Sequence, residues 1–128
     1  MSTVKKIQKI LVVDDDPVQL KLLQETLKTK GYEASTTADA SDGLQFAMKS
    51  APDLIILDVM MPIINGYNFC KLLKDNKKDI PVVLLTSRDE QDDIKIGLQM
   101  GADAYLTKPV NTNELFRTIQ VIENTVRR

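Results

Sequence analysis

Acidic side chains directly follow two apolar runs of this sequence. Segment 14–16 reads Asp-Asp-Asp and follows the run 10–13, and Asp58 follows the run 54–57. Continuous apolar runs bounded by turn signals are typical of strands buried on both faces of a parallel sheet. The carboxyl ends of such strands meet at one edge, where open α/β sheets place their ligands. If the two strands are neighbours, these carboxylates converge.

A cluster of Asp14, Asp15 and Asp58 would need a counter-ion. Like charges about 4 Å apart repel by roughly 4 kcal/mol per pair at an effective dielectric constant of about 20. Hard oxygen ligands, and few of them, favour Mg²⁺, which keeps several waters and often binds phosphate. The alternative is an acidic helix N-terminus, which the helix dipole favours. For Asp16, before Pro17, a capping role is explanation enough.

The turn that follows the run 10–13 contains no glycine. A dinucleotide-binding fold would require G-x-G-x-x-G at this position, so that backbone amides could approach a pyrophosphate. Negative side chains there would instead repel phosphate and attract a divalent cation. A nucleotide cofactor bound at this turn is therefore excluded.

Two other polar side chains end expected strands. Thr86 follows the run 82–85, and Lys108 follows the short strand expected over 103–107. A hydroxyl and an ammonium at the same sheet edge could donate hydrogen bonds to phosphate oxygens. A strand-end turn for Thr86 and a surface charge for Lys108 are the simpler alternatives. Lys108 precedes Pro109, and an X-Pro bond at a strand–helix junction is a candidate for the cis isomer.

Helical periodicity alternates with the apolar runs along the chain. Helices are predicted from Pro17 to the stop at Gly31, over 39–50, after Asn65-Gly66, over 90–100 and over 111–128, with a weaker strand over 32–37. About five strand–helix repeats with short loops imply right-handed crossovers and a parallel sheet. The predicted fold class is α/β, a doubly wound five-stranded parallel sheet with helices on both faces.

Composition narrows the function classes. The 128 residues are 43% hydrophobic and 27% charged, which suits one domain with a genuine core. The formal net charge of −1 gives no general reason to expect nucleic-acid binding. Histidine is absent, which excludes histidine-based catalysis and histidine metal sites. Cys70, the single cysteine, cannot form an internal disulfide. We expect a cytoplasmic protein without membrane contact.

Four motifs in order resemble a known family. They are Val12-Val13-Asp14-Asp15, Leu57-Asp58-Val59-Met60-Met61-Pro62 with Gly66, Leu84-Leu85-Thr86-Ser87, and Gly101-Ala102-Asp103-Ala104-Tyr105 with Lys108-Pro109. Together they resemble a response-regulator receiver domain of two-component or phosphorelay signalling. The resemblance implies the flavodoxin-like strand order 2-1-3-4-5. It also implies a single receiver domain over 1–128, with no output domain in this chain. The family's usual aspartate before the glycine is Asn65 here, which caps a helix about equally well.

By position, the resemblance makes Asp58 the phosphoacceptor. A phosphohistidine on a sensor histidine kinase or histidine phosphotransfer protein would be the donor. Asp15 and Asp58 would bind Mg²⁺ directly, Asp14 mainly through water, and the backbone carbonyl of Met60 would be a further ligand. Phosphoryl transfer has a loose transition state, so positioning and charge neutralisation meet most of its needs. The domain would hydrolyse its own phosphoryl group slowly and would not be a turnover enzyme.

The resemblance also implies a switch. Lys108 would bond the phosphoryl group, and Thr86 with Tyr105 would form the switch pair. The face built from the fourth helix, fifth strand and fifth helix would change and be read by a downstream protein or a missing output domain. Met60 and Arg88 should overhang the phosphoryl group, which predicts a long-lived phosphoaspartate.

Two other function classes fit these residues less fully. A receiver-like module used only for protein binding would not need the five polar residues Asp14, Asp15, Asp58, Thr86 and Lys108. A phosphatase of the haloacid-dehalogenase type would use D-x-D after its first strand, whereas Asp58-Val59-Met60 has no second acid. Neither alternative explains the residues as fully as a phosphoacceptor does.

Overall fold

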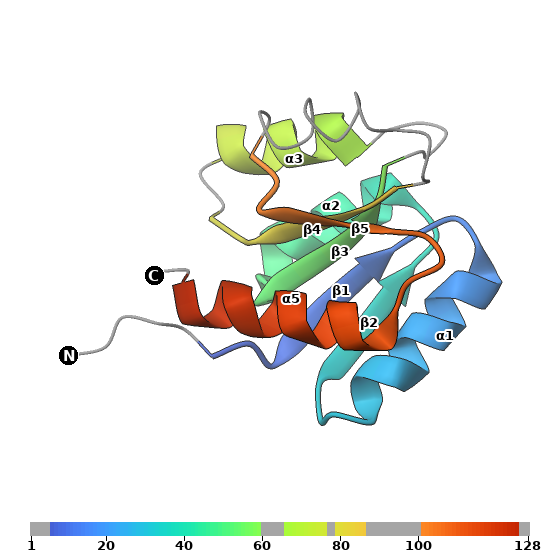
Figure 1. Cartoon of the computed structure of the whole chain (residues 1–128). Helices are drawn as coiled ribbons and strands as arrows, with labels where there is room; N and C mark the ends of the chain where they lie inside the picture. The colour runs from blue at the N-terminus through green and yellow to red at the C-terminus, as the bar shows by residue number, and fades with distance from the viewer. Residues whose placement is uncertain (1–5, 60–65, 77–78, 87–100, 126–128) are drawn as a thin grey trace.

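The computed structural model of the chain describes residues 6–59, 66–76, 79–86 and 101–125. Its elements, labelled in Figure 1, are β1 (Lys9–Val13), α1 (Pro17–Lys28), β2 (Glu33–Thr37), α2 (Ala40–Ser50), β3 (Leu54–Asp58), α3 (Gly66–Asp75), β4 (Val82–Thr86), β5 (Ala104–Thr107) and α5 (Thr112–Thr125). The helix predicted over 90–100 lies outside the described residues, as do Met60 and Arg88. None of the described helices has the length and hydrophobicity needed to cross a membrane.

The five strands form one parallel sheet in the order β2-β1-β3-β4-β5. This confirms the predicted fold class and strand order. In the register of the two central strands, Val13 lies beside Leu57. The residues that follow them, Asp14 and Asp58, therefore reach the same edge of the sheet.

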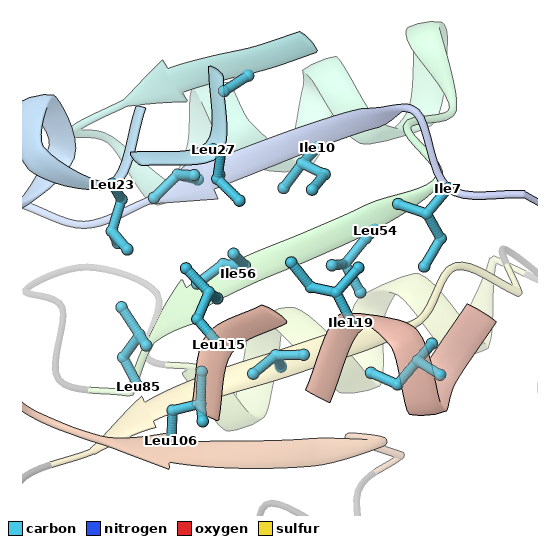
Figure 2. Packing of buried hydrophobic residues seen from close by; sticks show 14 of the residues in the cluster. Ile7, Ile10, Leu23, Leu27, Leu54, Ile56, Leu85, Leu106, Leu115 and Ile119 are labelled. Atoms are coloured by element: carbon cyan, nitrogen blue, oxygen red, sulfur yellow. The ribbon is translucent and has the colours of Figure 1, made fainter. Parts of the chain in front are cut away.

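Alternate residues of the strands face two separate hydrophobic cores. On one face, α1 and α5 contribute leucines and isoleucines, shown in Figure 2 against Ile10, Leu54 and Ile56 of the sheet. On the other face, α2 and α3 cover Leu11, Ile55 and their neighbours with small residues and Phe69. The strands of the sheet centre are buried on both sides, which explains their unbroken apolar sequence.

Local signals define the helix ends. The Asp16 side chain accepts a hydrogen bond from the Val18 backbone N–H at 3.0 Å, and Pro17 begins α1. Gly31, at φ +86°, follows the end of this helix. At α5, the Asn111 side chain accepts a hydrogen bond from the Glu114 N–H at 3.0 Å. These residues therefore fix where α1 begins and ends and where α5 begins.

Two residues of the helices have roles that follow from their tertiary neighbours. Gly43 lies inside α2, where a glycine normally weakens a helix. A Cβ at this position would lie 2.9 Å from Cγ2 of Val13, so glycine lets α2 approach β1 closely. In α3, Cys70 is fully buried while Leu72 is 37% exposed. The inward stripe of α3 therefore runs through Phe69, Cys70 and Leu73.

Candidate functional site

Three carboxylates meet at the carboxyl edge of the sheet, beside β1 and β3. Asp14 is fully buried, Asp58 is 6% exposed, and Asp15 is exposed to solvent. One oxygen from each lies within 4.8 Å of an oxygen of the other two. The structure thus brings together the three aspartates that the sequence singles out.

Asp14 is held from several directions. Its backbone N–H donates a hydrogen bond to the Thr37 carbonyl at 3.2 Å, at the end of β2. Its Oδ1 accepts a hydrogen bond from the backbone N–H of Asp16 at 3.0 Å. Its Oδ2 lies 3.1 Å from Nζ of Lys108. The orientation of this buried carboxylate is therefore set by the turn after β1 and by the lysine.

Lys108 bridges two of the acids. Its Nζ lies 3.1 Å from Oδ2 of Asp14 and 3.3 Å from Oδ2 of Asp58. Partial burial alone would lower the pKa of the Lys108 ammonium. The close contact with Asp14 and the charges of Asp58 and Asp14 outweigh burial, and the pKa of Lys108 lies above its ordinary value. This lysine therefore stays protonated and supplies positive charge at the cluster.

The backbone around Lys108 fixes where its side chain begins. The Lys108–Pro109 peptide bond is cis, as the sequence suggests for this junction. The Lys108 N–H donates a hydrogen bond of 2.7 Å to the carbonyl of Thr86, which ties the end of β5 to the end of β4. The two residues predicted to contact phosphate therefore lie at neighbouring strand ends.

Thr86 presents a buried hydroxyl at this edge. The residue is 1% exposed, and its Oγ1 has no hydrogen-bond partner among the residues that the structure describes. Leaving a buried hydroxyl unpaired costs about 1–3 kcal/mol. An oxygen atom brought into the site could accept this hydrogen bond and remove that cost.

Tyr105 lies one strand further along the sheet. It sits on β5 opposite Leu84, and it is 44% exposed. Thr86 pairs with Thr107, two residues beyond Tyr105. The two members of the expected switch pair are thus on neighbouring strands. Met60 and Arg88, the two flanking residues of the sequence analysis, fall outside the described part of the chain.

The donor set fits a hard divalent cation. All three side chains offer carboxylate oxygens, which are the ligands that Mg²⁺ prefers. Asp15 is open to solvent, so a cation bound there could keep part of its water shell. Spacing alone does not show that the Lys108 ammonium contacts the cluster and compensates part of the negative charge of its carboxylates. Only the signature of Lys before Pro at a strand end points toward it.

Comparison with known proteins identifies the family. The profile of the family described as "Response regulator receiver domain" matches residues 10–120. The chain belongs to the response-regulator receiver family. It is therefore a signalling domain of the kind found in two-component systems, and the resemblance found in the sequence is confirmed.

Curated relatives of this receiver domain are longer proteins. It is 42% identical over 115 residues to the alkaline phosphatase synthesis transcriptional regulatory protein PhoP of Bacillus subtilis, covering 90% of this chain and 48% of PhoP. It is also 42% identical over 114 residues to the response regulator PleD of Caulobacter vibrioides, covering 88% of this chain and 25% of PleD. The chain thus spans half or less of these relatives.

Solved structures of receiver domains superpose closely on it. A response regulator described as putative, from Chloroflexus aurantiacus, gives a TM-score of 0.87 at 33% identity, covering 93% of this chain and 99% of that one. The chemotaxis protein CheY4 of Vibrio cholerae gives a TM-score of 0.84 at 33% identity, covering 91% of this chain and 99% of that one. Proteins of the same family therefore share the fold of this receiver domain over more than nine-tenths of its length.

Proposed function

We propose that this receiver domain accepts a phosphoryl group on Asp58 and relays the change to a partner protein. The observation that carries the proposal is the position of Lys108, whose ammonium contacts both Asp14 and Asp58 beside the buried hydroxyl of Thr86. A carboxylate nucleophile, an adjacent cation and a hydrogen-bond donor meet the electrostatic needs of phosphoryl transfer.

The donor is a phosphohistidine on a sensor histidine kinase or a histidine phosphotransfer protein. An Asp58 carboxylate oxygen attacks phosphorus, the bond between phosphorus and the histidine nitrogen breaks, and the imidazole leaves with its electron pair. The product on this chain is an acyl phosphate. Asp58 is nearly buried at a strand end, where the attacking oxygen has little conformational freedom.

Mg²⁺ would be held directly by Asp15 and Asp58 and mainly through water by Asp14, with the Met60 backbone carbonyl as a further ligand. When bound, it would neutralise the negative charge of the carboxylates and the phosphoryl oxygens. Lys108 would exchange one of its two carboxylate contacts for a hydrogen bond to a phosphoryl oxygen. The unpaired Thr86 hydroxyl would donate to another.

The switch would start from Thr86. As its hydroxyl moves toward the phosphoryl group, Tyr105 on the neighbouring strand would turn inward from its half-exposed position. The face made by the helix expected over 90–100, β5 and α5 would then change, and a downstream protein or an output domain would bind it.

The phosphoryl group should persist for longer than in receivers with small flanking residues. Met60 and Arg88 follow Asp58 and Thr86 by two positions each. Long side chains at these positions would restrict the approach of water opposite the bond to Asp58. Arg88 could also bond a phosphoryl oxygen.

The proposal is tested by incubating the chain with acetyl phosphate and measuring the intact mass. A single phosphoryl adduct should form with Mg²⁺, and it should be lost with EDTA or in the variant Asp58→Asn. Asp75→Asn, which removes an exposed carboxylate of α3 that pairs with Lys71, is the matched control and should leave the adduct unchanged. An undiminished adduct in Asp58→Asn would contradict the assignment.

A further inference from the structure

A groove at the C-terminal end of α1 offers a second place for a ligand. It lies between the end of α1 and the first half of α5, with a volume of about 650 Å³. Both helices cover the same face of the sheet, as Figure 1 shows. The lining residues are Thr29, Lys30, Tyr32, Thr112, Asn113, Phe116, Arg117 and Gln120. None of these residues belongs to the acidic cluster of Asp14, Asp15 and Asp58.

An aromatic pair forms part of this groove. The rings of Tyr32 and Phe116 stack with centroids 6.3 Å apart and an interplanar angle of 16°. Both side chains are partly buried against the core between the sheet and the two helices. Nζ of Lys30 lies 5.5 Å from the centroid of the Phe116 ring. The packing holds an apolar surface and a cation side by side.

The groove is positively charged, although the chain as a whole is not. Lys30 and Arg117 both line it, and none of its described lining residues is acidic. The formal net charge of the whole chain is −1. Glu33 and Glu123 line a neighbouring hollow that shares Lys30 and Tyr32 with the groove and also contains Lys6 and Lys9. Glu123 is engaged there, since it accepts a hydrogen bond from the Ile7 N–H at 2.6 Å.

We propose that this groove binds an acidic peptide segment of a partner protein. Carboxylates of the segment would meet Lys30 and Arg117, and an apolar side chain would rest on the aromatic pair. Aromatic residues and arginine are enriched at the buried centres of protein interfaces, where few residues carry most of the binding energy. Charge complementarity selects an acidic partner over a neutral or basic one.

A nucleotide fits the groove less well. A base would need a free aromatic face for stacking. Phe116 already stacks on Tyr32 and has the Lys30 ammonium over its ring. These two contacts leave less of the Phe116 ring for a base to stack on.

The proposal does not depend on phosphorylation of Asp58, so it is tested on the unphosphorylated full chain. Short peptides are selected from a random displayed library, and the dissociation constants of the enriched peptides are measured for the wild type and for the variants Lys30→Glu and Arg117→Glu. Both substituted side chains are exposed, so neither change should disturb the fold. Lys49→Glu, at an exposed position of α2 on the other face of the sheet, makes the same change in net charge.

Enriched peptides should be acidic and carry an apolar residue. Their binding should weaken about tenfold or more in Lys30→Glu and in Arg117→Glu, because an attraction becomes a repulsion, and by less than about twofold in Lys49→Glu. The proposal is wrong if no peptide is enriched, if the enriched peptides are neutral or basic, or if the groove variants bind them as the wild type does. Binding of ATP or an oligonucleotide that is lost in the same two variants would also overturn it.

Discussion

Removing the Lys108 ammonium should tighten Mg²⁺ binding. The ammonium contacts Asp14 and Asp58 at 3.1 and 3.3 Å, so it competes with a cation for the same carboxylates. In Lys108→Met the side chain keeps a similar length and loses its charge. The carboxylates then lack their internal counter-ion, and a divalent cation gains attraction without first weakening two ion pairs.

The size of this effect follows from the two contacts. Opposite charges about 3.2 Å apart attract by roughly 5 kcal/mol at an effective dielectric constant of about 20. The Lys108 side chain is 29% exposed. Solvent screening and the desolvation of the charges reduce the net value to about 1–2 kcal/mol. That free energy corresponds to about 5- to 30-fold tighter binding of Mg²⁺.

Isothermal titration calorimetry measures this directly, and it suits a chain that has no tryptophan to report binding by fluorescence. Lys71→Met is the matched control, because Lys71 forms an exposed ion pair with Asp75 on α3, away from the cluster. Its affinity for Mg²⁺ should equal that of the wild type at constant ionic strength. Unchanged or weaker Mg²⁺ binding in Lys108→Met would refute the view that the lysine acts as an internal counter-ion.

Three further predictions concern packing, titration and lifetime. Gly43→Ala should lower the free energy of unfolding, measured in urea, by about 1–3 kcal/mol, because the added Cβ would lie 2.9 Å from Cγ2 of Val13. A higher free energy of unfolding, as expected for alanine at an unobstructed helical glycine, would contradict this. Burial raises the pKa of the Cys70 thiol from 9.0 to about 12, so iodoacetamide at pH 8 should label it only after unfolding. Because the unfolded thiol ionises first, this residue's contribution to stability should decline as pH rises from about 9 to 12, and Cys70→Ala should lack that decline. Met60→Ala and Arg88→Ala, alone and combined, should speed the first-order decay of the phosphorylated chain; unchanged or slower decay would show that these side chains do not shield the site.

The fold was predictable because its signals are local. The run 54–57 is apolar throughout since β3 is buried on both faces, and Asp58 ends it at the edge where ligands bind. Capping by Asp16 and by Asn111 marks helix starts within a few residues. Such features depend on neighbours in the sequence, so they can be inferred without coordinates.

Features that depend on distant neighbours were not predictable. Gly43 is needed because Val13, on another element, leaves no room for a Cβ. The sequence predicts that Lys108 and Asp14 end strands at the same sheet edge, but it does not predict that their side chains form an ion pair. The stack of Tyr32 on Phe116 likewise depends on how α5 lies beside the turn after α1. In each case the tertiary partner, and not the residue type, decides the role.

The most direct test of the central claim is to locate the phosphoryl group. After incubation with a phosphohistidine-bearing donor and Mg²⁺, borohydride reduces the acyl phosphate of a modified aspartate to homoserine. Tandem mass spectrometry of the peptides then identifies the position. The account predicts homoserine at residue 58 alone, with Asp14 and Asp15 unmodified. Homoserine at another aspartate, with residue 58 intact, would contradict it.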